Sequence, residues 1–209
     1  FGEWGAAVTS SHFCSAERQY RTPLEYGGQR TPTSQWTATA AGAVVLAKNG
    51  DGPYITHVTP GRIRDKGIKD ANNMGAAMAW AAYDTISQHL KDTKRSSSFY
   101  DLIVTGDLGK LGMEIVIDLF AADGIELRGN YNDCGIMLFD LEGQDVHCGA
   151  SGCGCAASVL TGYLLNGMRE GKWHNLLFCA TGALHSPTSL GQGESIPGIC
   201  HAVAISTQK

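Results

Sequence analysis

The stretch that decides the fold is YDLIVTGDLGKLGMEIVIDLF, residues 100–120. Its first part, residues 100–105, is short, apolar and partly β-branched, which predicts a buried strand. A glycine-rich turn follows at residues 106–109, and residues 111–120 repeat apolar side chains at the spacing of an amphipathic helix. A strand that passes through a tight turn into a helix is the repeating unit of α/β folds, so the sequence predicts this class.

Strand and helix patterns alternate on both sides of this unit. Further strands are predicted at residues 5–10, 42–47, 54–58, 134–139, 176–180 and 202–205, and further helices at residues 70–90 and 156–169. The alternation favours a sandwich of mostly parallel strands with helices on both faces. The helix at 70–90, with Asp70 or Asn72 as its cap, is so rich in alanine that we expect it to lie between two sheets.

Composition and charge exclude several classes of function. The 209 residues are 43% hydrophobic and 17% charged, with a net charge of -4, which is ordinary for a globular protein. Nucleic-acid binding is not expected because there is no block of Lys and Arg, and no apolar run of about 18 residues predicts a membrane span. The seven cysteines, several inside apolar runs, are expected to be reduced thiols rather than a disulfide framework.

A second glycine-rich segment, CGASGCGCAAS at residues 148–158, runs into a predicted helix. Backbone N–H groups at a helix start favour an anion. However, no Gly-Lys-Ser/Thr follows, and the dinucleotide fingerprint is matched only in its relaxed form. Cys153 and Cys155 lack the usual zinc spacing. They are interpreted as small residues at a crowded helix start, with pocket lining as the alternative.

Polar residues also occupy turns next to predicted strands, and ligands bind at strand ends in open α/β sheets. Asp107 could be a general base, a hydrogen-bond acceptor or a helix cap, and the cap is favoured. His185 could act as an acid or base because histidine titrates near neutrality, or it could have no chemical role. Asp133 is expected to accept a hydrogen bond from a neighbouring turn.

Several of these stretches together resemble the stage V sporulation protein AD family of the thiolase superfamily. They are residues 10–13, 15–21, 32–37, 101–107, 144–146, 149–155, 180–188 and 193–197. The resemblance covers nearly the whole chain and implies a thiolase-like layered α/β sandwich (αβαβα). Residues 1–50 would then end the first thiolase half and residues 51–209 would form the second, so that much of the first half is expected to be absent from this chain.

The resemblance also places two catalytic positions of the superfamily. Residues 106–110 look like the turn that holds a histidine in condensing enzymes, here Asp107. Residues 152–158 look like Gly-Asn-Thr-Ser-Ala-Ala-Ser, with Cys153 in place of asparagine. Decarboxylative condensation needs neutral donors beside a developing enolate, whereas an ionised aspartate would repel it and a thiol donates weakly. No catalytic residue is therefore expected.

What the resemblance implies instead is binding of dipicolinic acid, alone or with calcium, during its movement into the developing spore. The residues expected to bind the ligand are Asp107, Cys153, Gly152, Gly154, Asn73, Met74 and His185. Asn72 is a further candidate for the pocket wall, and Arg18, Arg21 and Arg30 are candidate cations, although a surface role is favoured for each arginine. No cofactor and no resident metal is expected.

The resemblance also implies partners and a location. The expected partners are membrane proteins of the same sporulation assembly and a second copy of the chain, with residues 5–10 and the long loop at 20–36 as the dimer contact. The expected location is the forespore or spore, where the protein is either soluble on the cytoplasmic side or peripheral to the inner spore membrane, with no transmembrane segment. Two alternatives stay open, namely a thiolase-like acyltransferase with altered residues and a structural role with a relict pocket.

Overall fold

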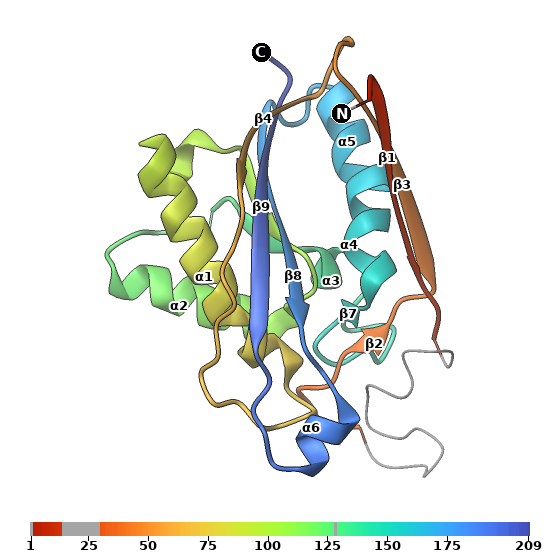
Figure 1. Cartoon of the computed structure of the whole chain (residues 1–209), viewed down its shortest axis with the longest axis vertical. Helices are drawn as coiled ribbons and strands as arrows, with labels where there is room; N and C mark the ends of the chain where they lie inside the picture. The colour runs from red at the N-terminus through yellow and green to blue at the C-terminus, as the bar shows by residue number, and fades with distance from the viewer. Residues whose placement is uncertain (1, 14–29, 128) are drawn as a thin grey trace.

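The computed structural model describes residues 2–13, 30–127 and 129–209 (Figure 1). Most of the long loop expected at residues 20–36 lies outside the described residues, as do Arg18 and Arg21. Within the described part, no helix is both long enough and apolar enough to cross a bilayer.

A five-stranded sheet forms the centre of the fold (Figure 1). Its strands lie in the order β4 (Tyr54–Thr59), β9 (Gly198–Ser206), β8 (Asn175–Ala183), β5 (Leu102–Thr105) and β6 (Tyr131–Asp133). β6, β5 and β8 are parallel, and β9 is antiparallel to both β8 and β4. Four of these five strands therefore run in one direction, which confirms the prediction of a mostly parallel sheet. Every residue of β5 is buried, as its apolar sequence requires when both faces are covered.

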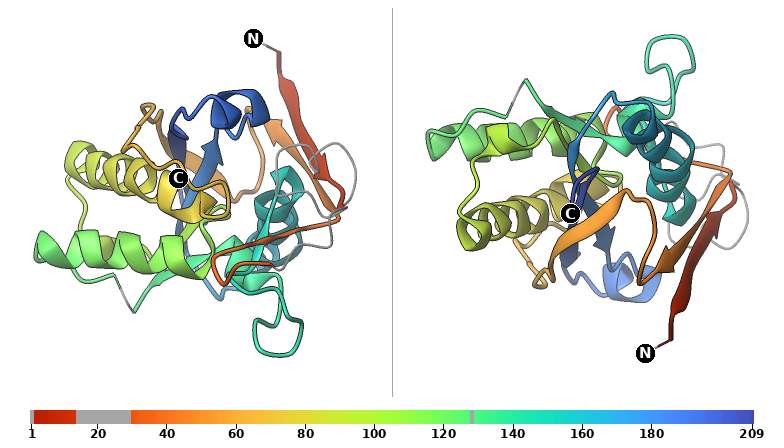
Figure 2. Two further views of the ribbon diagram at one scale, coloured as in Figure 1. Left: turned by 90° about the horizontal axis from the view of Figure 1, so that it is seen from below. Right: turned by 90° about the horizontal axis from the view of Figure 1, so that it is seen from above.

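Helices cover both faces of this sheet (Figures 1 and 2). On one face, α1 (Met74–Thr93) packs against α2 (Gly109–Ala122). The other face is covered by a continuous helical segment made of α4 (Cys153–Val159), the π-helical η4 (Leu160–Leu164) and α5 (Leu165–Arg169). Shorter helices are η3 (Ser97–Phe99), α3 (Cys134–Met137) and α6 (Pro187–Gly191).

A second sheet lies against the far side of α4 (Figure 2). It is the antiparallel pair of β1 (Trp4–Ser11) and β3 (Ala40–Ala47), and a short parallel pair, β2 (Trp36–Thr37) with β7 (Ala150–Ser151), lies nearby. The layers are therefore helix, sheet, helix and sheet, in agreement with the expected layered sandwich. The helix between two sheets is α4, not α1, so that the prediction for the alanine-rich helix was wrong. The small residues of α1 serve instead for close packing on β9 and on α2.

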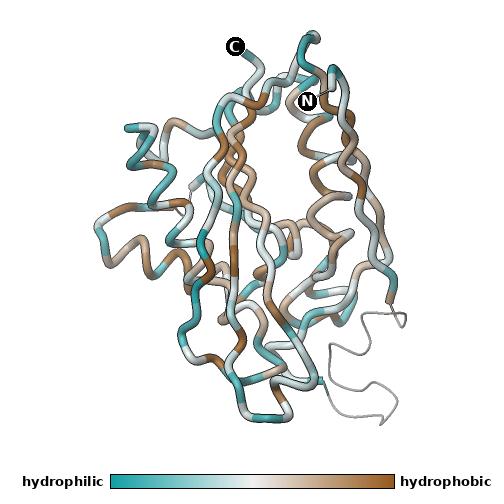
Figure 3. Tube along the Cα trace, viewed as in Figure 1, coloured by the Kyte–Doolittle hydropathy of each residue, from teal (hydrophilic) through white to brown (hydrophobic). Residues whose placement is uncertain are grey.

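Two hydrophobic clusters hold the layers together, and Figure 3 shows brown apolar segments along the central strands and the helices that cover them. One cluster lies on the α1–α2 side of the sheet and includes Ile103 and Phe120. The other lies on the α4–α5 side and includes Val104 and Leu176. Ile103 and Val104 belong to different clusters because successive side chains of a strand point to opposite faces.

Two local predictions were wrong. Residues 134–139 do not form a strand, because the strand is β6 and α3 follows it at once. Helix α1 begins at Met74, and its cap is Asn73 rather than Asp70 or Asn72. The side chain of Asn73 accepts a hydrogen bond from the backbone N–H of Ala76 at 3.2 Å, which satisfies a donor of the first helical turn.

Candidate ligand-binding pocket

A cavity of about 570 Å³ opens where the C-terminal end of β8 meets the start of α4 and the β1–β3 sheet. Its walls are mainly apolar and include Val8, Val44, Met74, Met78, Leu160 and Phe178. Its polar groups include Asp107, Gly152, Cys153, Thr181 and His185. The structure thus brings together five of the residues predicted for the site, namely Asp107, Gly152, Cys153, Met74 and His185.

The other two predicted residues, Gly154 and Asn73, do not line the cavity. Gly154 faces β3, where a Cβ atom would lie 2.1 Å from the carbonyl oxygen of Ala40. Its backbone N–H donates to the hydroxyl of Ser11 at 2.9 Å. Asn73 uses its side chain as the cap of α1. Both residues therefore hold elements of the pocket together rather than face a ligand.

The carboxylate of Asp107 joins the turn after β5 to two other elements. Its Oδ1 accepts from the hydroxyl of Thr181 on β8 at 3.0 Å, and its Oδ2 accepts from the backbone N–H of Gly152 at 3.0 Å. Gly152 is the N-cap residue of α4, where a negative charge is favoured by the helix dipole. Asp107 therefore binds the start of α4 and not the start of the helix that follows it, α2, whose N-cap residue Leu108 makes no capping hydrogen bond with its own side chain.

The carboxylate that holds the start of α2 belongs to Asp133 instead. Its Oδ2 accepts from the N–H of Leu108 and its Oδ1 from the N–H of Gly109, each at 2.9 Å. The hydroxyl of Thr105 and the N–H of Gly135 donate to the same carboxylate at 2.7 and 2.9 Å. The prediction that Asp133 accepts from a neighbouring turn is confirmed.

Asp133 has no exposed surface, and this burial changes its ionisation. Burial raises the pKa of Asp133 from 3.8 to about 6, and the negative charge of Asp107 adds to the rise. The hydrogen bonds from Thr105, Gly109 and Leu108 favour the carboxylate and so oppose the rise in pKa.

Sequence reasoning missed two polar residues that shape the site. Thr181 both donates to the Asp107 carboxylate and accepts from the Asp107 N–H, at 3.0 and 3.1 Å. Gln35 donates from Nε2 to the carbonyl oxygens of Asp107 and Ala150, at 2.8 and 3.0 Å. Thr181 lies directly after a predicted strand and could have been found by the rule that ligands bind at strand ends in α/β sheets. Nothing in the sequence near Gln35 points to its contacts with Asp107 and Ala150.

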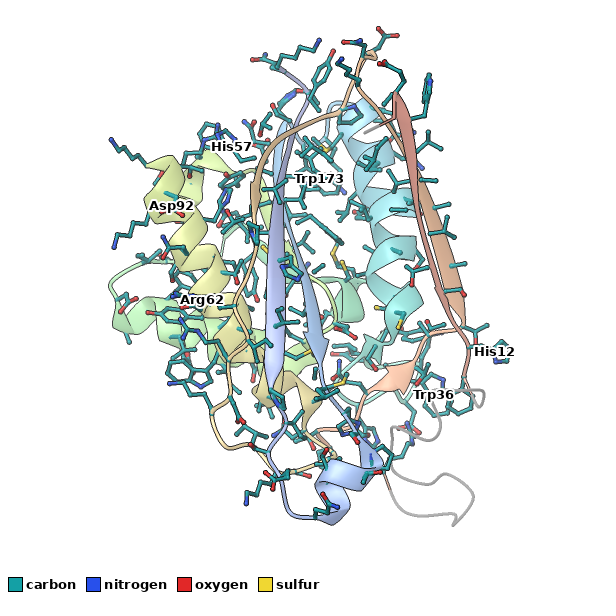
Figure 4. All side chains as sticks on the ribbon, viewed as in Figure 1. His12, Trp36, His57, Arg62, Asp92 and Trp173 are labelled. Carbon is teal, nitrogen blue, oxygen red and sulfur yellow. The ribbon has the colours of Figure 1, made fainter. Side chains whose placement is uncertain are left out.

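Arg30, a candidate cation, is engaged on the surface. It forms a salt bridge with Asp145, and its guanidinium lies 4.9 Å from the centre of the Trp36 ring. Trp36 is itself stacked on Phe13, near the end of the β1–β3 sheet (Figure 4). Arg30 does not line the cavity, which agrees with the favoured surface role.

Cys153 differs from the other described cysteines. The described residues include six cysteines, all free thiols, of which Cys153 is exposed whereas the other five are buried, namely Cys134, Cys148, Cys155, Cys179 and Cys200. Among the residues that the structure describes, no group of three or more His, Cys, Asp or Glu side chains could hold a metal ion.

This difference predicts selective modification of the pocket thiol. Iodoacetamide should modify Cys153 at least about tenfold faster than the buried cysteines, because access controls thiol chemistry. Peptide mass mapping after timed reactions measures each site. The protein with Cys14→Ser, which removes a thiol outside the described residues, and Cys153→Ser serve as controls. Equal labelling of Cys153 and Cys179 in the folded protein would contradict the pocket geometry.

Comparison with known proteins decides the family. A family model for Stage V sporulation protein AD (SpoVAD) matches residues 2–206. The chain belongs to this family. Stage V sporulation protein AD of Bacillus subtilis (strain 168) is 45% identical over 203 residues, which are 97% of this chain and 60% of that protein. This member of the SpoVAD family therefore spans less than two thirds of the length of that relative.

A solved structure supports the fold of this SpoVAD-family chain. The 3-oxoacyl-(acyl carrier protein) synthase III of Pseudomonas aeruginosa PAO1 matches with a TM-score of 0.54 at 12% identity, over 98% of this chain and 59% of that chain. Similarity at such low identity shows the fold alone. The thiolase-like fold expected from the sequence is confirmed.

Proposed function

We propose that this chain forms part of a component of the sporulation machinery that binds dipicolinic acid, and that the ligand occupies the cavity beside Asp107. The observation that carries the proposal is the pairing of apolar walls with one polar end at the ends of β5 and β8. A planar aromatic dicarboxylate needs an apolar surface for its ring and donors for its carboxylates. The volume of about 570 Å³ lies within the usual range for small-ligand pockets.

The charge of Asp107 bears on the form of the ligand. A dianion beside this buried carboxylate would be repelled, and like charges about 6 Å apart cost on the order of 2–3 kcal/mol at an effective dielectric constant of 20. The calcium complex of dipicolinate carries no net charge and avoids this cost. We therefore infer that calcium enters as part of the ligand. The described residues offer no cluster that would hold the ion by itself.

The proposal favours binding over condensation chemistry. Asp107 occupies a position where the superfamily resemblance would place a histidine, and its carboxylate already accepts from Thr181 and Gly152. A charge of this sign opposes the formation of an enolate. Membrane proteins of the same assembly and a second copy of the chain are the proposed partners, at the forespore or spore membrane.

An acyltransferase is the second candidate, because the exposed thiol of Cys153 shares the cavity with His185. Incubation with acyl thioesters, followed by mass spectrometry of the Cys153 peptide, separates the two functions. A stable acyl group on Cys153, released by an acceptor, would favour the enzyme.

Isothermal titration of dipicolinate, with and without calcium, into the full-length protein tests the main proposal. We expect saturable binding that calcium tightens about tenfold or more, because calcium removes the repulsion by Asp107. In Asp107→Asn the amide can still accept from Gly152 and can donate to Thr181, but the charge is gone. The ratio of the dissociation constants measured without and with calcium should therefore approach one in this variant.

The exposed Asp118→Asn on α2 is the matched control, and its ratio should equal that of the wild type. The same titration into residues 1–209 alone shows how much of the site this chain supplies. Absence of saturable binding to well-folded full-length protein would overturn the proposed function. An unchanged ratio in Asp107→Asn would overturn only the role assigned to the charge.

A further inference from the structure

The turn at the polar end of the cavity is anchored by the carboxylate of Asp133. Each oxygen of Asp133 accepts two hydrogen bonds: Oδ1 from the amides of Gly109 and Gly135, and Oδ2 from the amide of Leu108 and the hydroxyl of Thr105. These donors come from β5, the start of α2 and α3. Leu108 directly follows Asp107, so that Asp133 fixes the turn that presents Asp107 to the cavity.

Of these four donors, Thr105 alone can change its role. A hydroxyl donates or accepts, whereas a backbone N–H can only donate. The Thr105 Oγ1 atom lies 2.7 Å from Asp133 Oδ2, 3.1 Å from the Tyr131 hydroxyl and 3.4 Å from the carbonyl oxygen of Asn132. Thr105 therefore has a second acceptor within reach if Asp133 stops accepting from it.

A proton on Asp133 has one favourable place. On Oδ1 it would meet the N–H groups of Gly109 and Gly135, neither of which can accept. On Oδ2 it can be donated to Thr105, whose own hydrogen turns to Asn132. Leu108 then donates to the hydroxyl oxygen of a carboxylic acid, which is a weaker acceptor than a carboxylate oxygen, while Gly109 and Gly135 keep the unprotonated oxygen as their acceptor.

We propose that Asp133 is a positioning residue for the pocket and that, with Thr105, it forms a proton-operated latch: a proton on Asp133 Oδ2 weakens the hydrogen bond from the Leu108 N–H and loosens the turn that carries Asp107. The latch is defined as the pair Asp133 and Thr105 with the amide of Leu108. Its effect on ligand affinity rests on the proposed function, whereas its effect on the Leu108 amide does not.

The surroundings of Asp133 place this event in an accessible range of pH. Burial first, and the charge of Asp107 next among the groups that raise it, bring the pKa of Asp133 to about 6. The latch is therefore closed above this pH, where Asp133 is ionised, and open below it. No salt bridge to Asp133 occurs within residues 2–13, 30–127 and 129–209.

Three other titratable groups near Asp133, namely Tyr131 and the thiols of Cys134 and Cys179, are neutral in this range. Burial raises the pKa of Tyr131 on β6 and of the Cys134 thiol on α3 well above their ordinary values. Burial does the same to the Cys179 thiol on β8, which lies beyond Tyr131. Cys155 on α4 is a buried thiol next to Cys134. Asp107 is the carboxylate whose negative charge raises the pKa of Asp133.

The test is an amide NMR titration of the ligand-free full-length protein between pH 5 and 8. We expect the Leu108 amide to shift with a midpoint near 6 and to lose protection from hydrogen exchange below it. Gly109 and Gly135 should keep their protection. Constant protection of Leu108 through the whole range, or a simultaneous loss at all three amides, would overturn the latch.

Variants of Thr105 separate a latch from a merely structural contact. The hydroxyl of Thr105 lowers the pKa of Asp133, so that Thr105→Val should move the midpoint to higher pH. Thr105→Ser keeps the hydroxyl and should restore the wild-type midpoint. A contact with a purely structural role would change stability in Thr105→Val and leave the midpoint where it was, which would overturn the proposal.

Binding of equimolar calcium and dipicolinate at the same pH values tests the coupling to the pocket. We expect the affinity to fall several-fold below the midpoint and this fall to move with the amide midpoint in Thr105→Val. Titration of the ligand itself is common to all variants and cancels in the comparison. If the pH at which the affinity falls does not follow the midpoint of the Leu108 amide titration, the coupling is overturned. Absence of binding would refute the proposed function, and the amide titration would still decide on the latch.

Discussion

Replacement of Asp133 by alanine is expected to lower the free energy of unfolding by roughly 2–5 kcal/mol. The change leaves the amides of Leu108, Gly109 and Gly135 without their acceptor in a site that has no exposed surface. Each such buried donor costs about 1–3 kcal/mol. The raised pKa of Asp133 shows that its buried charge is unfavourable. Removal of this charge offsets part of the loss of stability. Even at the lower end of the range, about 2 kcal/mol, the variant is less stable than the wild type.

Urea denaturation followed by circular dichroism measures this change, provided that the dependence on urea stays the same in the variant. Asp118→Ala is the matched control, because Asp118 is an exposed aspartate on α2. Its effect should stay within about 0.5 kcal/mol. If the two variants are equally stable, the carboxylate of Asp133 does not anchor the turn.

Gly154→Ala is expected to destabilise the protein by about 3 kcal/mol or more, although alanine is the better helix former by about 1 kcal/mol. The added Cβ would lie 2.1 Å from the carbonyl oxygen of Ala40 and 2.7 Å from the hydroxyl of Ser11. The first of these is backbone and cannot move aside without a displacement of β3. Steric repulsion therefore outweighs helix propensity at this position. Because β3 also carries Val44 into the cavity, ligand binding should weaken as well.

The control for this prediction lies on the same helical segment. Gly162 has nothing within 4 Å of an added Cβ, so that Gly162→Ala should be neutral or stabilising by up to about 1 kcal/mol. Thermal unfolding of both variants separates the two effects. A stabilised Gly154→Ala protein would mean that α4 does not pack against β3 as closely as the structure shows.

The strand-turn-helix pattern at residues 100–120 was sufficient to predict β5, α2 and the class of the fold, since period and turn chemistry are local properties of the sequence. The strand at residues 134–139 was wrong because a short apolar run fits a strand and a helix equally well. The caps were assigned wrongly for a different reason. Capping rules look a few residues along the chain, whereas Asp107 and Asp133 cap α4 and α2 from 45 and 25 residues away.

In the candidate site too, residues placed by the local sequence could be predicted, whereas residues placed by packing between distant segments could not. Asp107 and His185 could be placed together because both follow strands of one sheet, and Cys153 because it begins a helix after a glycine-rich turn. Val8 and Val44 could not, because they face the cavity only through the packing of β1 and β3 on α4. Gly154 was predicted as a site residue on the strength of its glycine-rich neighbourhood, but its lack of a side chain serves the approach of β3.

The contact between Ser11 and Gly154 joins positions that are 143 residues apart, and the cavity is lined by residues from both regions. A contact of this kind closes a long loop, and its entropic cost must be met before the contact contributes any stability. Segments such as α1 and α2, which are near neighbours in the chain, can associate earlier. We therefore expect the cavity to be among the last features to form during folding, so that a ligand would act on the finished protein rather than on its assembly.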